Sequence, residues 1–192
     1  MSTRLTLSVD AMGGDAAPQM VIDGVALAAD RLANVDFLLF GDETRIAPLV
    51  RAHKNLDGRV RIRHTADIVA ATDKPSVALR AGRNSSMRLA INAVHDGEAA
   101  GIVSAGNTGA LMAMAKFVLK TLTGIDRPAI AGLFPNLQGQ TVVLDLGANV
   151  ECDADNLVQF AIMGEVFARR GLAIESPLVG LLNVGVEELK GH

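Results

Sequence analysis

Glycine-rich segments with polar neighbours recur along the chain, and each of them follows a short apolar run. The clearest is residues 104–109, Ser-Ala-Gly-Asn-Thr-Gly, where two glycines stand among three side chains that can donate hydrogen bonds. Glycine lets a ligand approach backbone N–H groups closely, and a helix that begins directly after such a turn adds a partial positive charge. Phosphate is a natural ligand for this combination, so residues 104–109 predict an anion-binding turn.

Three further segments share this character: residues 12–15, 145–149 and 183–185. At the carboxyl ends of parallel strands, all four would meet at the edge where open α/β sheets bind ligands. Tight strand-to-helix turns need glycine whatever they bind, so one such turn favours neither interpretation, whereas four at one edge favour a site. The residues expected to bind phosphate or substrate are Asp10, Gly13, Gly14, Asp15, Ser104, Gly106, Asn107, Thr108, Gly109, Asp145 and Asn149.

The sequence lacks the motifs of several other chemistries. It contains no Gly-x-x-x-x-Gly-Lys-Ser/Thr and no Gly-x-Gly-x-x-Gly after the first strand, which argues against an NTPase or an NAD enzyme. No serine lies in a Gly-x-Ser-x-Gly elbow, and the four histidines show no paired metal-ligand spacing. Cys152 has acidic neighbours, which favours a structural thiol over a nucleophile. If the protein is an enzyme, we therefore expect it to work without metal or cofactor, by positioning its substrates and without a covalent intermediate.

The composition narrows the class of protein further. With 49% hydrophobic and 20% charged residues among 192, the chain can bury a sizeable core. A formal net charge of −3 and the absence of Trp and Tyr argue against nucleic-acid binding. No signal peptide opens the chain, no apolar run is long enough to span a membrane, and the single cysteine fits a reducing compartment. These features predict a cytoplasmic protein.

Short apolar runs alternate with amphipathic stretches along the chain. Strands are predicted over residues 5–9, 35–40, 60–63, 101–104, 129–134, 141–144 and 178–182. Helices are predicted over residues 18–31, 44–52, 86–96 with Ser86 as the cap, 110–120 and 156–170, whereas residues 65–85 give no clear pattern. Such alternation predicts an α/β fold with a mostly parallel sheet and helices on both faces.

The organisation predicted from this pattern is a single α/β domain over residues 1–192. Because the chain stops soon after a strand, where a covering helix usually follows, we expect it to be the incomplete N-terminal part of a longer protein.

Charge is distributed unevenly. Between Arg80 and Arg127 there are six basic and three acidic residues, so this segment predicts a positive face that attracts an acidic partner, with scattered solvated charge as the alternative. Lys190 follows the last glycine-containing loop and is a candidate site residue, with a solvated lysine as its alternative.

The segments jointly resemble one family, the bacterial acyl-acyl carrier protein:phosphate acyltransferases of phospholipid synthesis, called PlsX. The resemblance runs in order through residues 10–15, 85–88, 104–112, 127–129, 144–149, 159–164 and 181–191. It covers essentially the whole chain and corresponds to the N-terminal part of the family. It implies a fold similar to phosphotransacetylases and isopropylmalate dehydrogenase. Val186 departs from the family pattern, in which many relatives have Glu.

The resemblance also implies a reaction, in which inorganic phosphate attacks the thioester of an acyl-acyl carrier protein and gives acyl phosphate and the free carrier thiol. Lys190 and Asn183 are then the expected catalytic residues, with Lys190 stabilising negative charge. Arg83 and Arg88 are expected to dock the acidic carrier protein. A homodimer, and association with the membrane or with a membrane acyltransferase, are further expectations.

Two other functions stay open at this point. A phosphotransacylase that uses coenzyme A would share the fold and the anion-binding turns, and the chain could also be an inactive, dimerising fragment. For residues 1–192 alone we expect weak phosphate binding, self-association through an unfinished last strand, and no acyl transfer.

Overall fold

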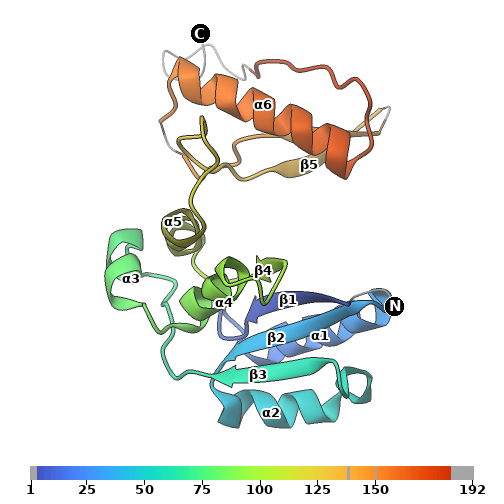
Figure 1. The fold of residues 1–192 in the computed structure, drawn as a ribbon, viewed down its shortest axis with the longest axis vertical. Coiled ribbons are helices and arrows are strands. Elements are labelled where there is room, and N and C mark those ends of the chain that lie inside the picture. Colours follow the sequence, from blue (N-terminus) through green and yellow to red (C-terminus); the bar gives the residue numbers. More distant parts are fainter. Residues whose placement is uncertain (1–3, 138, 150, 183–192) are drawn as a thin grey trace. The chain divides into compact units, whose positions relative to one another are not determined.

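A computed structural model describes residues 4–137, 139–149 and 151–182 of the chain (Figure 1). These residues fall into two compact units, Met1–Lys120 and Thr121–His192, which are described in turn. The single domain predicted from the sequence stays a prediction.

The first unit is built on a parallel sheet whose strand order is β3-β2-β1-β4. Its strands are β1 (Leu5–Asp10), β2 (Val35–Gly41), β3 (Val60–His64) and β4 (Gly101–Val103). In the register, Asp10 pairs with Phe40, and Val9 pairs with Val103, so the strands β1, β2 and β4 end at one edge. The predicted parallel sheet is confirmed.

Helices cover both faces of this sheet, as predicted. On one face Ile22 and Ile46 are fully buried in a cluster that includes Phe37, and on the other Ala90 packs against Leu38. Successive residues of β2 therefore pack on opposite faces, which explains why all four residues from Phe37 to Phe40 are apolar. The helices are α1 (Gln19–Arg31), α2 (Glu43–Ala52), α3 (Pro75–Ala81), α4 (Ser86–His95) and α5 (Thr108–Leu119), with a 3-10 turn at Lys54–Leu56.

Polar side chains fix where the helices of the first unit begin. Asp42 accepts a hydrogen bond from the Thr44 N–H at 3.0 Å and caps α2. Helix α4 is capped by Ser85, whose Oγ accepts from the Arg88 N–H at 3.3 Å. The cap was predicted at Ser86, and this was wrong by one residue because the Ser86 hydroxyl is bonded elsewhere, to a carboxylate at the end of β1.

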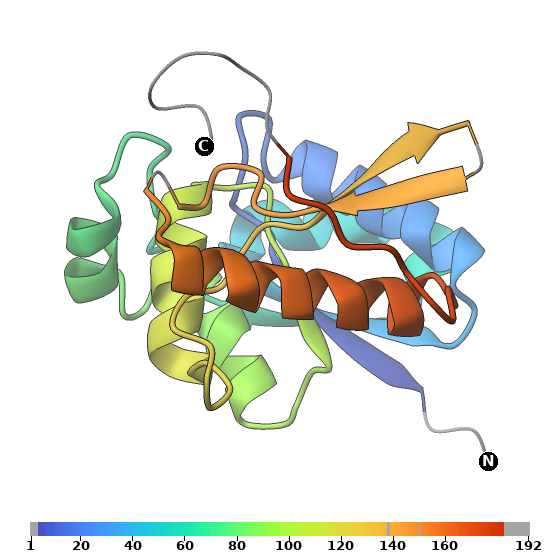
Figure 2. The same cartoon turned by 90° about the horizontal axis from the view of Figure 1, so that it is seen from above.

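The second unit consists of a hairpin and a long helix (Figure 2). Strands β5 (Gly132–Asn136) and β6 (Gly139–Val143) pair antiparallel and form a separate sheet. Helix α6 (Ala154–Gly171) begins with a capping box formed by Asp153 and Asn156. None of the helices in the described ranges is long and apolar enough to cross a membrane.

The strand predicted over residues 178–182 is wrong. These residues have no regular structure, and the side chains of Leu178, Leu181 and Leu182 are exposed. A strand requires a neighbouring strand for its backbone hydrogen bonds, and none of the described residues pairs with this run.

Candidate functional site

Two of the predicted turns meet at the carboxyl edge of the parallel sheet. A Cβ added to Gly13, after β1, would lie 2.9 Å from the backbone nitrogen of Gly106, after β4. A Cβ on Gly106 would in turn lie 3.3 Å from the Gly13 Cα and 3.0 Å from the end of the Met87 side chain. The close approach of these two turns therefore requires glycine at position 13 and leaves little room for a side chain at position 106.

A buried carboxylate joins the two turns. Asp10 is 2% exposed, and its Oδ2 accepts a hydrogen bond from the Ser104 hydroxyl at 2.7 Å. Its Oδ1 accepts from the Ser86 hydroxyl at 2.6 Å and from the Met12 N–H at 3.3 Å. The Ser104 Oγ also accepts from the Gly106 N–H at 3.1 Å. Asp10 therefore ties the start of α4 and the turn after β4 to the end of β1.

Asn107 is a structural part of the same turn. Its side-chain oxygen accepts from the Ala110 N–H at 3.0 Å and caps α5. Its amide nitrogen lies within hydrogen-bond distance of the carbonyl oxygens of Ala70, Ala71 and Asp73, at 3.2, 3.0 and 2.9 Å. The amide that the sequence analysis assigned to phosphate is therefore already engaged within the protein, and its contact with an anion stays a prediction.

The donors of this turn that have no acceptor among the described residues include backbone groups and the Thr108 hydroxyl. Thr108 and Gly109 begin α5, and within the described part of the chain their N–H groups have no hydrogen-bond acceptor. The first turn of α5 contains no acidic residue that would neutralise the helix dipole. Gly109 packs closely against Pro75 of α3, since an added Cβ would lie 2.8 Å from its ring. These two N–H groups can bind an anion.

The turn predicted at residues 145–149 belongs to the second unit. Asp145 accepts hydrogen bonds from the Ile130 N–H at 2.7 Å, from the Asn149 N–H at 2.6 Å and from the Asn149 amide at 3.1 Å. Partial burial raises the pKa of Asp145, but these bonds and the Ala148 N–H outweigh it and hold the pKa below its usual range. The Asn149 amide also donates to the Pro128 carbonyl at 2.9 Å. Asp145 and Asn149, both predicted as site residues, thus bind each other, and their remaining hydrogen bonds go to neighbouring backbone groups.

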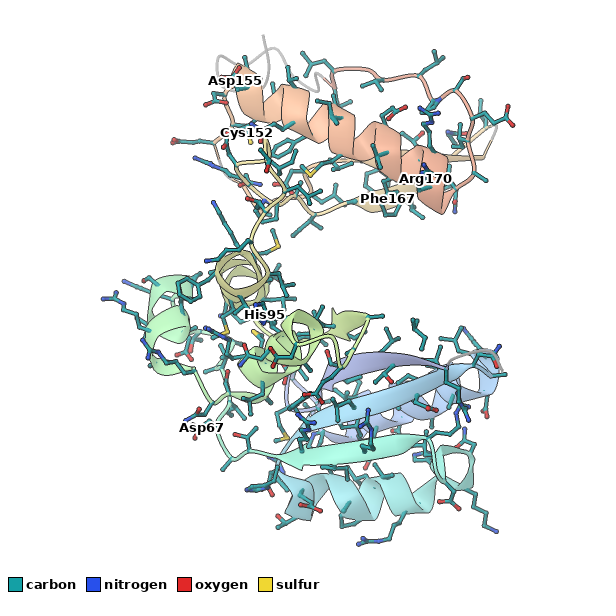
Figure 3. The ribbon with its side chains drawn as sticks, in the orientation of Figure 1. Asp67, His95, Cys152, Asp155, Phe167 and Arg170 are labelled. Atoms are coloured by element: carbon teal, nitrogen blue, oxygen red, sulfur yellow. The ribbon has the colours of Figure 1, made fainter. Side chains whose placement is uncertain are left out.

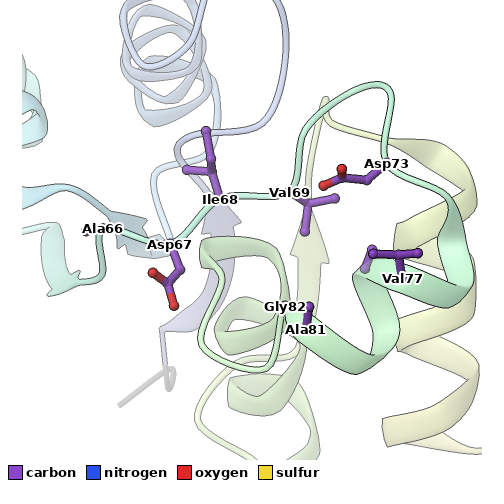
Figure 4. A pocket seen from close by; sticks show the side chains of 9 residues that line it. Ala66, Asp67, Ile68, Val69, Asp73, Val77, Ala81 and Gly82 are labelled. Carbon is purple, nitrogen blue, oxygen red and sulfur yellow. The ribbon is translucent and has the colours of Figure 1, made fainter.

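Loop 65–74 and α3 form a pocket of about 410 Å³ (Figure 4). Its walls include Ile68, Val69 and Val77 together with the carboxylates of Asp67 and Asp73. None of the residues of turns 10–15 and 104–109 lines it. The pocket is therefore distinct from the edge of the sheet, although Asn107 binds the loop that forms its wall.

The predicted positive face carries an aromatic side chain. The guanidinium of Arg88 lies 5.3 Å from the ring centre of Phe117, and the Lys120 ammonium lies 4.9 Å from it. Burial lowers the pKa of Arg88 from its usual range, and the positive charge of Arg83 lowers it further. Phe117 is 54% exposed, and Arg83 is also exposed. We call Arg83, Arg88, Phe117 and Lys120 the basic α4–α5 surface.

Some of the residues predicted from the sequence lie outside the sites described above, or outside the described part of the chain. Asn183 and Lys190, and with them the turn at residues 183–185, lie outside the described residues. Cys152, predicted as a structural thiol, is exposed just before α6, where Asp155 lies on the first turn (Figure 3). Among the described residues no group of three or more His, Cys, Asp or Glu side chains is arranged to hold a metal ion.

Two residues of these sites were missed by the sequence analysis. Ser86 was taken for a helix cap, yet its hydroxyl reaches Asp10, 76 positions earlier in the chain. The available signal was the pair of adjacent serines. One serine is enough to cap the helix, so the hydroxyl of the other is left for a different partner. Phe117 was assigned to an apolar helix, and only its exposure between two cations distinguishes it.

Comparison with known proteins agrees with this fold. The chain is 65% identical to the phosphate acyltransferase of Rhodospirillum centenum over 192 residues, which are all of this chain and 54% of that protein. It is 63% identical over 191 residues to that of Rhodospirillum rubrum, covering 55% of it. The chain thus spans about half the length of the curated relatives it matches.

Solved structures with a similar fold are phosphotransacetylases. The enzyme from Streptococcus pyogenes has a TM-score of 0.63 at 16% identity, over 84% of this chain and 53% of that one. EutD phosphotransacetylase from Staphylococcus aureus has a TM-score of 0.60 at 21% identity, over 86% and 53%. The predicted phosphotransacetylase-like fold is therefore confirmed. Residues 5–192 match the family described as "Fatty acid synthesis protein", so this chain belongs to that family, and the PlsX resemblance of its motifs is confirmed.

Proposed function

We propose that the protein transfers a fatty acyl group from an acyl-acyl carrier protein to inorganic phosphate, and that turn 104–109 of this chain binds the phosphate. The observation that carries the proposal is the pair of N–H groups of Thr108 and Gly109 at the start of α5, which have no acceptor among the residues that the structure describes. The names of the relatives, phosphate acyltransferases at up to 65% identity, support the reaction.

The chemistry fits a site without a nucleophilic side chain. A phosphate oxygen attacks the thioester carbon, the C–S bond breaks, and the departing sulfur takes up the proton that hydrogen phosphate supplies. The products are acyl phosphate and the carrier thiol, so atoms and charge balance. The protein has to bind the anion, align the thioester with it and stabilise the developing oxyanion. Lys190 is the candidate for the last role.

The carrier protein would dock on the basic α4–α5 surface. Its cations have no salt bridge to an acidic side chain within the described residues, so they are free to attract an acidic partner. Phe117 offers an exposed apolar contact between them. A homodimer, a cytoplasmic location and membrane association stay predictions.

Acyl phosphate formation tests the reaction. The full-length protein should form acyl phosphate, trapped as hydroxamate, from acyl-acyl carrier protein and phosphate. Equal turnover with acyl-coenzyme A would favour the phosphotransacylase instead.

The same assay on the 192-residue chain tests what we expect of this chain alone, which is weak phosphate binding without turnover. Robust turnover by this chain alone, with its mass verified, would contradict that expectation. Absence of turnover in both proteins would refute the proposed reaction.

A further inference from the structure

Helix α6 carries a row of apolar side chains on the face that it does not bury. Its inner face packs against β6, and Phe160 on that face is buried. The outer face presents Val158, Ile162 and Val166, which are 59%, 55% and 50% exposed. Single exposed apolar residues are common on protein surfaces, but a contiguous row of three on one helix favours a surface that binds a partner.

Charged residues close this apolar row at both ends. Positions 155, 158, 162, 166 and 169 follow one another at intervals of three, four, four and three residues, so they share one face of the helix. The row is symmetric about Ile162, with a valine four positions away on each side. Seven positions away the charges are opposite, negative at Asp155 and positive at Arg169. We call these five residues the α6 stripe.

This symmetry makes the α6 stripe complementary to itself in one orientation. When two antiparallel helices are related by a twofold axis at Ile162, each position before Ile162 lies opposite the equivalent position after it in the other copy. Val158 then packs against Val166 of a second copy, and the two Ile162 side chains meet on the axis. Asp155 lies opposite Arg169 at both ends. A parallel pair would instead place like charges against each other, which is unfavourable.

The charged ends of the α6 stripe can make these contacts. Asp155 is exposed and forms no salt bridge within the described residues. Arg169 binds Glu165 through one nitrogen at 3.0 Å, and its guanidinium has further N–H groups for a second carboxylate. Glu165 would lie opposite Gln159 of the other copy, three positions from Ile162 on the other side. The antiparallel pairing therefore brings no like charges of α6 together.

We propose that the α6 stripe is a homodimer interface, in which the α6 helices of two copies of the chain pack antiparallel about a twofold axis at Ile162. A second copy fits both features of the stripe, its apolar centre and the opposite charges at its ends. The proposal does not depend on the phosphate site. One pair of helices is small for a protein interface, so we expect a dimer that dissociates in the micromolar range.

Sedimentation equilibrium of the 192-residue chain tests the interface and should show monomer and dimer in equilibrium. Ile162→Glu places two carboxylates on the axis and should leave the chain monomeric up to about 100 µM. Leu181→Glu is the matched control, because it changes another exposed leucine-type residue of the second unit, in the run where the sequence analysis expected self-association. It should dimerise like the parent chain.

Two results of this experiment would overturn the proposal. The first is a parent chain that is monomeric throughout, which would assign the α6 stripe to the part of the longer relatives that this chain does not span, or to another protein. The second is a dimer that Ile162→Glu leaves intact; loss of that dimer in Leu181→Glu would assign self-association to residues 178–182.

Exchange of the two charges tests the direction of the helices. Asp155→Arg places a second cation opposite Arg169 and should weaken the dimer about 10-fold, since each dimer contains this contact twice. Arg169→Asp should have the same effect. The double variant restores opposite charges at both ends and should dimerise within about threefold of the parent chain. Single variants that dimerise like the parent, or a double variant without recovery, would refute the antiparallel pairing.

Disulfide cross-linking in a Cys152→Ser background tests the register, with circular dichroism to confirm the fold of each variant. Ile162→Cys should cross-link two copies on air oxidation, because the two positions meet on the axis. Val158→Cys alone should not, since the two 158 positions lie about 12 Å apart along the helices, but it should cross-link when mixed with Val166→Cys. A disulfide in Val158→Cys alone, or none in Ile162→Cys, would overturn the proposed interface.

Discussion

Gly13→Ala should destabilise the first unit strongly for a change of one methyl group. The added Cβ would lie 2.5 Å from the Asp10 Oδ2, 2.9 Å from the Gly106 nitrogen and 2.9 Å from the Ser104 Oγ. None of these atoms is the free end of a flexible side chain. The carboxylate is held by two hydroxyls, and the nitrogen belongs to the backbone. The turns after β1 and β4 would therefore have to separate.

The size of the effect follows from what that separation breaks. Overpacking of a buried position costs about 1–3 kcal/mol, and loss of the bond between Ser104 and Asp10 would add about 1.5–3 kcal/mol. Because some relaxation spares part of each cost, we expect the free energy of unfolding to fall by about 2–4 kcal/mol. Phosphate affinity should fall as well, since turn 104–109 moves.

Gly24→Ala is the matched control for this experiment. Gly24 lies within α1, and a Cβ added there meets nothing within 4 Å. Alanine should therefore stabilise the helix, by about 0.5–1 kcal/mol.

Urea unfolding followed by circular dichroism measures both variants, because the chain has no Trp or Tyr to report by fluorescence. Amide hydrogen exchange at residues 104–106 shows where the loss occurs. A Gly13→Ala variant as stable as Gly24→Ala would refute the close contact of the two turns.

Further predictions follow from the other contacts. Asn107→Ala should remove the α5 cap and lower stability by about 1–2 kcal/mol, with weaker phosphate binding in a calorimetric titration; unchanged binding would place the anion elsewhere. Asp145, with its lowered pKa, contributes stability above about pH 4 that is lost as the pH falls through the lowered value, so Asp145→Asn should flatten the acid dependence of hydrogen exchange in the second unit. In the full-length protein, Arg83→Glu should raise the KM for acyl-acyl carrier protein and flatten its salt dependence, whereas Arg51→Glu on α2 should not. Lys190→Ala there should lower kcat by about two orders of magnitude with little change in Tm; near-normal kcat would leave Lys190 as a solvated lysine.

The sequence predicts the elements of the first unit well because buried parallel strands and their turns leave local signals. Residues 37–40 are four successive apolar residues followed by glycine, and the strand is Val35–Gly41. A helix predicted over 44–52 is observed as Glu43–Ala52, one residue longer, with an acidic cap just before it. Glycine, proline and capping residues act within a few positions of themselves, so their pattern is readable without the fold.

Strand pairing joins residues that lie far apart in the sequence, so the predictions of which runs pair, and in which sheet, are less accurate. Residues 178–182 have the composition of a strand and no partner among the described residues. The strands predicted over residues 129–134 and 141–144 are observed as Gly132–Asn136 and Gly139–Val143, but they pair antiparallel in a sheet of their own and not in the mostly parallel sheet. Whether an apolar run pairs, and in which direction, depends on residues far away in the sequence.

In the candidate site, too, the sequence predicts which residues can form hydrogen bonds, but it does not predict the partners of those bonds. Sequence analysis identifies Ser104 and Asn107 as donors by type. The structure directs the Ser104 hydrogen to Asp10 and the Asn107 amide to loop 70–73, so among the described residues the donors left free include the first backbone N–H groups of α5 and the Thr108 hydroxyl. A side chain's hydrogen-bond partner can lie 94 positions away, as it does for Ser104 and Asp10, and no local pattern encodes that choice.

The phosphate site that we propose, with helix N–H groups beside a buried carboxylate and no Lys or Arg in turns 10–15 and 104–109, suits a substrate that must react. Binding energy that is equal in the ground state and the transition state does not raise kcat. A cation paired with phosphate would stabilise the free anion and withdraw charge from the attacking oxygen. Backbone dipoles would hold the anion without supplying a full charge. We therefore expect a positive charge in the complete site to act on the thioester oxygen, where negative charge develops, and not on the phosphate.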